Sequence, residues 1–235
     1  MSVAILSPHL DDAVVSAWSA LRSDGALVVN VFDGAPPAGT LERWDRVTGA
    51  SDSRVRMGER LEEDREALAL AGRESTSLGL LEAQYRDGPP DAAALDAGLR
   101  AALAEAGDVD ELWAPAGIGE HADHVAVRDW ALAAGPRVFL YADLPYAIRH
   151  GWPAWVTGEE PQAYFSQDEW WAAALPAGVE LTPRAHELPE EEVELKLRAL
   201  AAYRTQIEGI DGGTQRLLRN PKVIRYEVSW TVGAG

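Results

Sequence analysis

The fold is decided by the stretch VAILSPHLDDAVVS, residues 3–16, in which a run of apolar residues ends at one histidine and two adjacent carboxylates. Val3–Leu6 has the short, continuously apolar pattern of a buried strand. The next segment predicts a helix over residues 12–22, because apolar residues recur there at helical spacing before Gly25. Strand, polar turn and helix in this order are typical of the first unit of an α/β protein.

The same alternation of apolar strands and helical segments continues along the chain. We expect further strands over residues 27–32, 77–81, 111–114, 137–141, 179–188 and 226–232, and helices over residues 55–71, 92–106, 122–134 and 189–207. This pattern predicts an α/β, Rossmann-like fold with a mostly parallel sheet, helices on both faces, and a single domain over residues 1–235.

Two segments have no clear period. Residues 34–54 are dense in turn residues, and we interpret them as a functional or mobile loop. The aromatic segment 143–173 has no assigned role.

The composition narrows the chemistry. The chain has no cysteine, so a metal site must use nitrogen and oxygen ligands. The net charge of −17 argues against nucleic acid and anionic membranes as partners. The absence of a long apolar run and of a secretory signal leads us to expect a cytoplasmic protein with a small-molecule substrate.

Three of the five histidines occur in two places, His9 in HLDD and His121 with His124 in GIGEHADHVAVRDW. In a doubly wound sheet the first and fourth strands are neighbours, and a crevice opens at their carboxyl ends. Both groups follow those two strands. A catalytic zinc ion takes three protein ligands and keeps one position open, and His9, Asp12 and His124 could supply this set. Asp11 would then be free to accept a proton from water.

Simpler interpretations exist for each group alone. Asp11 and Asp12 could cap the first helix, and His121 with Asp123 could belong to a solvated loop. A metal-free fold that binds a small ligand at the same crevice is a third hypothesis. The joint occurrence of both groups at two neighbouring strand ends favours a metal site.

Two motifs in the sequence resemble those of the PIG-L or LmbE-like zinc-dependent N-deacetylases. PHLDDA, residues 8–13, is similar to the family's His-Pro-Asp-Asp-Glu motif, and HADH, residues 121–124, to its His-x-Asp-His motif. Weaker resemblance extends through RLEEDREALALAG, residues 60–72, and KLRALAAYRTQ, residues 196–206.

The resemblance implies that His9, Asp12 and His124 bind the metal and that Asp11 is the general base and later the proton donor. It also implies that a cationic His121 stabilises the tetrahedral oxyanion. Zinc is the default ion, and Fe²⁺, Co²⁺ or Mn²⁺ suit the same donor set.

Further roles follow from the resemblance or from position. Asp123 would orient a histidine. Arg60 would contact substrate, unless it is a surface charge paired with Asp64. Tyr146 is expected on the crevice side of the sheet. Trp152, Trp155, Trp170 and Trp171 are candidates for stacking on sugars or for packing.

Two departures from the family pattern affect the expected substrate. Leu10 replaces the usual proline and Ala13 the usual acid, which puts substrate contacts and loop stiffness in doubt. The resemblance implies N-acetylated sugars or glycosides as substrates. Hydrolysis of another amide or of an ester in natural-product tailoring is the alternative.

Overall fold

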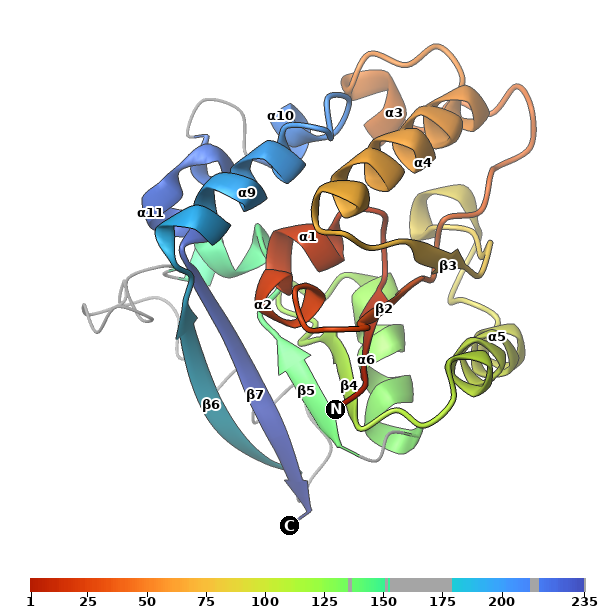
Figure 1. Cartoon of the computed structure of the whole chain (residues 1–235). Coiled ribbons are helices and arrows are strands. Elements are labelled where there is room, and N and C mark those ends of the chain that lie inside the picture. Colours follow the sequence, from red (N-terminus) through yellow and green to blue (C-terminus); the bar gives the residue numbers. More distant parts are fainter. Residues whose placement is uncertain (135–136, 151, 153–178, 212–215, 235) are drawn as a thin grey trace.

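The computed structural model of the chain describes residues 1–134, 137–150, 152, 179–211 and 216–234. In these residues seven strands form one sheet in the order β3-β2-β1-β4-β5-β7-β6 (Figure 1). The strands are β1 Val3–Ser7, β2 Leu27–Asn30, β3 Ser75–Ser77, β4 Glu111–Pro115, β5 Val138–Tyr141, β6 Val179–Glu187 and β7 Tyr226–Ala234. The first five are parallel, which confirms the predicted α/β fold with a mostly parallel sheet.

Strand β1 marks the point where the chain reverses its direction across the sheet. It pairs with β2 through Ile5 and Val28, and with β4 through Ile5 and Trp113. All five residues of β1 are buried, as expected for a strand that is covered on both faces. The crevice of a doubly wound sheet therefore opens between the carboxyl ends of β1 and β4.

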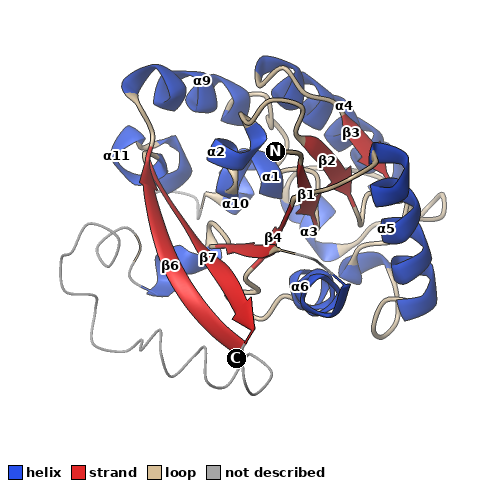
Figure 2. Cartoon of the chain, turned by 60° about the horizontal axis from the view of Figure 1, so that its bottom comes forward, coloured by secondary structure: helices blue, strands red, loops and turns tan. Residues whose placement is uncertain are grey.

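Helices cover both faces of this sheet, as predicted. Figure 2 shows α1, α2, α4 and α9 on one face and α5 and α6 on the other. The helices are α1 Asp12–Ser16, α2 Trp18–Leu21, α3 Arg43–Val47, α4 Ser53–Leu70, α5 Ala92–Ala106, α6 Ala122–Ala134, α9 Glu190–Leu200, α10 Ile207–Ile210 and α11 Pro221–Ile224. Short 3₁₀ turns are η1 Ala83–Tyr85, η2 Tyr146–His150 and η4 Leu217–Arg219. None of the helices in the described part of the chain is long and apolar enough to cross a membrane.

The edge of the sheet formed by β7 and β6 is antiparallel, and a buried ion pair connects it to the helices. Strand β7 runs antiparallel to both β5 and β6. The Glu227 carboxylate on β7 accepts hydrogen bonds from Trp18 N and Ser19 N at 2.8 Å and from Lys196 Nζ at 2.7 Å. These bonds join β7 to α2 and α9.

The structure corrects three predicted boundaries. The third strand covers Ser75–Ser77 and not residues 77–81, because a polar edge strand gives no apolar signal. The predicted helix over residues 12–22 breaks at Ala17, since Glu227 binds the amides that begin α2. The predicted helix over residues 189–207 ends at Leu200, and Glu63 on α4 binds the backbone and side chain of Thr205 beyond it.

The segment that we interpreted as a functional or mobile loop contains α3. The Tyr85 hydroxyl donates a hydrogen bond to Asp45 Oδ2 at 2.8 Å, and Asp45 is fully buried. Trp44 Nε1 donates to Gln206 Oε1 at 2.9 Å. The segment is therefore anchored at two successive residues.

Candidate metal centre

The two polar groups of the sequence meet at the crevice between β1 and β4. His9, Asp11 and Asp12 follow β1, and His121 and His124 lie at the start of α6, which follows β4. The turn after β1 is fixed by Ser7, whose hydroxyl donates to His9 O at 2.6 Å and accepts from Ala13 N at 3.0 Å. Residues more than a hundred positions apart thus come together where the doubly wound topology predicts a site.

Three donor atoms from these groups form a compact triangle. Asp12 Oδ2 lies 3.4 Å from His9 Nδ1 and 3.2 Å from His124 Nε2, and the two nitrogens are 3.2 Å apart. An ion bound tetrahedrally at 2.0–2.1 Å separates its ligand atoms by about 3.3 Å. The donor set therefore fits a divalent metal in both atom type and spacing.

The other ring nitrogen of His9 is held by Asp123. His9 Nε2 lies 3.0 Å from Asp123 Oδ2, which also accepts from Ala83 N at 2.9 Å, and Arg86 binds the second carboxylate oxygen. Burial alone would lower the pKa of His9, but its hydrogen bonds to Asp12 and Asp123 outweigh burial and hold the pKa well above its usual value. Such a carboxylate fixes the orientation of a metal-binding imidazole.

His124 has an equivalent partner in Asp143, which sequence reasoning missed. His124 Nδ1 lies 2.5 Å from Asp143 Oδ1, and Asp143 Oδ2 accepts from Ile118 N at 2.9 Å. Burial lowers the pKa of His124, but Asp12 and Asp143 more than compensate and raise it to about 9. Asp143 lies two residues after β5, at the same edge of the sheet as the other site residues. This position could have identified it as a candidate site residue.

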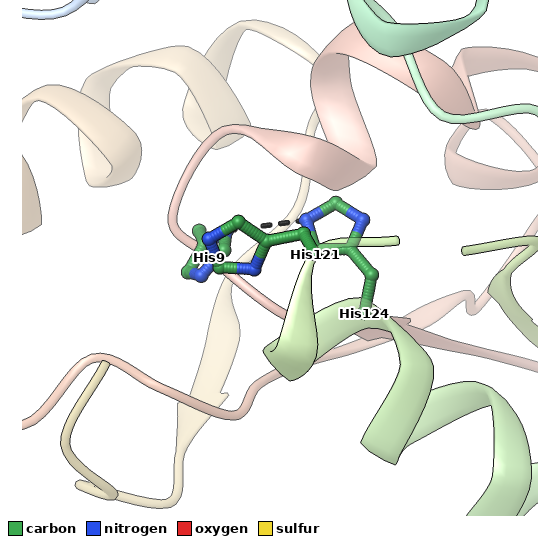
Figure 3. Close-up of side chains that lie close together, drawn as sticks. All are labelled: His9, His121 and His124. Atoms are coloured by element: carbon green, nitrogen blue, oxygen red, sulfur yellow. Dashed lines mark hydrogen bonds between the residues drawn. The ribbon is translucent and has the colours of Figure 1, made fainter. Parts of the chain in front are cut away.

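His121 completes a group of three imidazoles, shown in Figure 3. One ring nitrogen from each of His9, His121 and His124 lies within 4.8 Å of the other two, so these histidines form an alternative donor set. The set that includes Asp12 is tighter, because none of its three distances exceeds 3.4 Å. Asp123 N donates to His121 Nδ1 at 3.3 Å, which leaves Nε2 of the neutral ring to carry the proton.

The pKa of His121 depends on the charges of its neighbours. Burial, followed by the positive charges of His9 and His124, lowers the pKa of His121 to about 4. Those two charges belong to protonated rings, whereas a histidine that binds a metal is neutral. The cationic His121 that the resemblance implies therefore stays a prediction.

Asp11 and Asp12 differ in environment although they are adjacent. Burial and the nearby Asp12 raise the pKa of Asp11 to about 6, against the opposing effect of Arg60. Burial would also raise the pKa of Asp12, but the charge of His124 and hydrogen bonds to both histidines hold it well below its usual range. The Asp11 side chain makes no capping hydrogen bond to α1 and lines the cavity, so the capping interpretation does not account for it.

Arg60 lies in the site and not on the surface. Its side chain is buried, and NH1 lies 2.5 Å from Glu82 Oε1. Asp64, the alternative partner, binds Asn30 Nδ2 and the Tyr203 hydroxyl, each at 2.7 Å. The interpretation of Arg60 as a surface charge paired with Asp64 is therefore wrong. Glu82 could not be predicted as a partner of Arg60, because it lies in an aperiodic segment.

A cavity of about 500 Å³ opens over these groups. Tyr146 lines it, with its ring edge-on to His124 at a centroid distance of 5.6 Å. Tyr146 packs so closely on Gly119 that a Cβ there would lie 2.7 Å from the Tyr146 ring. Leu10 and Ala13 are buried and are not among the cavity's lining residues.

Within the described residues, the cavity is lined by a tryptophan that our sequence analysis did not single out. Trp152 is buried and donates from Nε1 to Val223 O at 3.3 Å, so it has a packing role. Trp155, Trp170 and Trp171 lie outside the described residues. Trp44, on α3, lines the cavity instead.

The fold and the site resemble those of known deacetylases. No family model matches the chain. The chain is 33% identical over 163 residues to 2'-N-acetylparomamine deacetylase of Streptomyces fradiae, a match that covers 61% of this chain and 57% of that relative. The match thus spans little more than half the length of the curated relative.

Solved structures of deacetylases match the chain over nearly all its length. A deacetylase–bog complex from the teicoplanin biosynthesis pathway aligns with a TM-score of 0.77 and 26% identity, covering 100% of this chain and 99% of that one. The antimicrobial reagent A40926 pseudoaglycone deacetylase aligns with a TM-score of 0.75 and 29% identity, covering 99% and 97%. The chain shares the fold of these deacetylases.

Proposed function

We propose that the chain is a metal-dependent hydrolase of the PIG-L or LmbE-like family that removes an N-acyl group, in the first place acetyl, from an amino sugar or glycoside. The triangle of donor atoms from His9, Asp12 and His124, with the carboxylate of Asp11 beside it in a cavity, carries this proposal. The names of the similar proteins support the substrate class, since they describe deacetylases of an acetylated paromamine and of a pseudoaglycone.

His9, Asp12 and His124 would hold the ion, and the cavity that they line leaves room for substrate. When bound, a divalent cation supplies polarisation of the amide carbonyl and acidification of water. Zinc is the first candidate, and Fe²⁺, Co²⁺ and Mn²⁺ suit the same two-histidine, one-carboxylate set.

Asp11 transfers a proton from water to the leaving amine. Its carboxylate accepts one proton from the attacking water as the new carbon–oxygen bond forms, and then delivers it to the amide nitrogen as the carbon–nitrogen bond breaks. The products are a carboxylate and a free amine. The absence of a capping bond to α1 leaves the Asp11 carboxylate available for this role.

His121 stabilises negative charge as a hydrogen-bond donor from Nε2. With Nδ1 accepting from Asp123 N, the Nε2–H is available to the oxygen that becomes negative in the tetrahedral intermediate. Asp123 contributes indirectly, because it orients His9.

Arg60 and Tyr146 are the substrate contacts in this proposal, since both line the cavity. Glu82 holds the Arg60 guanidinium through a buried ion pair. A guanidinium fixed in this way can donate to hydroxyl or carbonyl oxygens of a sugar with little loss of conformational entropy.

The test is acetate release by the chain loaded with one equivalent of Zn²⁺, with a panel of N-acetylglucosamine glycosides beside a simple aryl acetamide and an aryl acetate. We expect release from the glycosides, and its loss in Asp11→Asn but not in Asp24→Asn, because Asp24 is exposed and absent from the cavity lining. Activity on the aryl compounds alone would overturn the sugar assignment. If no acetate is released, the assay is repeated with Fe²⁺, Co²⁺ and Mn²⁺ in place of Zn²⁺. No release with any of these four ions would overturn the deacylase assignment.

A further inference from the structure

The cavity lining has two parts that differ in polarity. In the part beside Asp11, the lining side chains are charged or polar and include Arg60, Glu82 and Gln84. Guanidinium, carboxylate and amide groups donate and accept hydrogen bonds. This part of the lining is suited to the hydroxyl groups of a sugar.

The second part is apolar, and its polar side chains are already paired. Trp44, Ile210 and Leu217 line it and are only partly buried. Gln206 accepts from Trp44 Nε1 and donates to Thr205 Oγ1. Asp211 is buried and accepts from Leu218 N at 2.5 Å and from Arg219 Nε at 2.7 Å. Here the lining offers a ligand apolar surface and few open hydrogen bonds.

Trp44 is held rigidly in this wall. Its Nε1 is bound to Gln206 on the chain leading into α10, and a Cβ at Gly209 would lie 2.7 Å from the indole ring. The next residue, Asp45, is anchored by the Tyr85 hydroxyl. An aromatic ring positioned before binding loses little entropy when a ligand packs on it.

We infer that the substrate is an N-acylated amino sugar carrying an apolar aglycone, and that Trp44 is the residue that selects the aglycone. This inference rests on the proposed function. The sugar and its amide lie beside Asp11 and Arg60, and the aglycone packs against Trp44, Ile210 and Leu217. A second hydrophilic sugar in that place would lie against apolar side chains, where its hydroxyl groups find few hydrogen-bond partners.

The test compares kcat/KM for the methyl and phenyl glycosides of N-acetylglucosamine and for N,N'-diacetylchitobiose. We expect the wild-type chain to prefer the phenyl glycoside by about tenfold or more, from burial of the ring and its contact with indole. Trp44→Ala should remove most of this preference, and Trp44→Phe should keep part of it. Leu217→Asn should weaken it independently, so the inference does not depend on the folding of one variant.

Trp130→Phe is the matched control, because Trp130 lies on α6, donates to Asp96 Oδ1 and is not part of the lining. It should leave the preference unchanged. A wild-type chain that prefers N,N'-diacetylchitobiose, or a preference that survives both Trp44→Ala and Leu217→Asn, would overturn the inference. If no glycoside is hydrolysed, the proposed function fails. The affinities of the phenyl and methyl glycosides, measured by calorimetry, then still test the role of Trp44. We expect tighter binding of the phenyl glycoside by the wild-type chain and loss of this difference in Trp44→Ala.

Discussion

Two buried ionic clusters in this chain are built in opposite ways. In the described part of the chain, the Glu227 carboxylate accepts hydrogen bonds from two backbone amides and from the Lys196 ammonium, which is fully buried. At the metal centre, the acceptor oxygen of Asp12 and two ring nitrogens face one another within 3.4 Å.

The difference indicates which cluster has a function beyond stability. The Glu227 cluster is complete, because its charges and hydrogen bonds balance within the protein. At the centre beside β1 and β4, the three donor atoms lie close together. Their lone pairs repel one another unless protons or a cation lie between them. Carboxylates behind the histidines, Asp123 and Asp143, add negative charge that favours a cation there.

The largest effect is expected for a pair of substitutions at the centre. His124→Ala should abolish stoichiometric metal binding and with it activity, because one of three ligands is removed. Asp11→Asn should keep the metal but lower kcat by about 100- to 10,000-fold, because only the proton-transfer group is lost. Metal content by elemental analysis and rates of acetate release distinguish the two. Equal metal loss in both variants would contradict the division of roles.

The structural cluster predicts a loss of stability without a change in metal binding. Lys196→Met leaves Glu227 buried without its cation and should lower the free energy of unfolding by about 3 kcal/mol. Urea denaturation measures this, and Lys222→Met, at an exposed lysine, should change it by less than about 0.5 kcal/mol. A Lys196→Met chain of wild-type stability would show that the cluster is not structural.

Asp143→Asn sharpens the comparison, because Asp143 belongs to the centre without being one of the three donors. The loss of its charge should weaken zinc affinity by about 10- to 100-fold through His124. Competition with a chromophoric chelator measures the affinity. Asp129→Asn, an exposed acid on α6, the helix that carries His124, is the control and should leave the affinity unchanged. If Asp143→Asn binds zinc with unchanged affinity, Asp143 does not contribute to metal binding.

The smallest effect concerns Asp64, a buried acid that belongs to neither cluster. Burial raises its pKa to about 7, although Tyr203 and Asn30 donate to it. Because the folded-state pKa exceeds the unfolded value of about 3.9, Asp64 contributes stability that is full below pH 4 and is lost as pH rises through 7. Between pH 5 and 8 the wild type should lose about 3 kcal/mol of stability relative to Asp64→Asn, measured by urea denaturation. Parallel pH profiles for the two proteins would contradict this.

Local patterns in the sequence predicted most of the fold. Buried parallel strands such as Val3–Ser7 are continuously apolar, and the adjacency of β1 and β4 followed from the doubly wound topology. The features that were missed depend on remote partners. Glu227 divides α1 from α2, Glu63 binds the chain beyond α9, and β3 is a polar edge strand.

The site shows the same limit. His9, Asp11, Asp12, His121, Asp123 and His124 were found because they cluster in sequence, and the structure brings them together. Glu82, Arg86 and Asp143 are single residues in aperiodic segments, so only the fold shows what they contact. Leu10 and Ala13 attracted attention as departures from a motif, but both are buried.

The central claim is that Asp12, and not His121, completes the ligand set with His9 and His124. Zinc titration of the metal-free Asp12→Asn and His121→Ala chains tests it most directly, with circular dichroism to verify folding. The account predicts that His121→Ala binds one equivalent of zinc with near wild-type affinity and that Asp12→Asn does not. Retained binding in Asp12→Asn together with loss in His121→Ala would contradict it and assign the site to the three histidines.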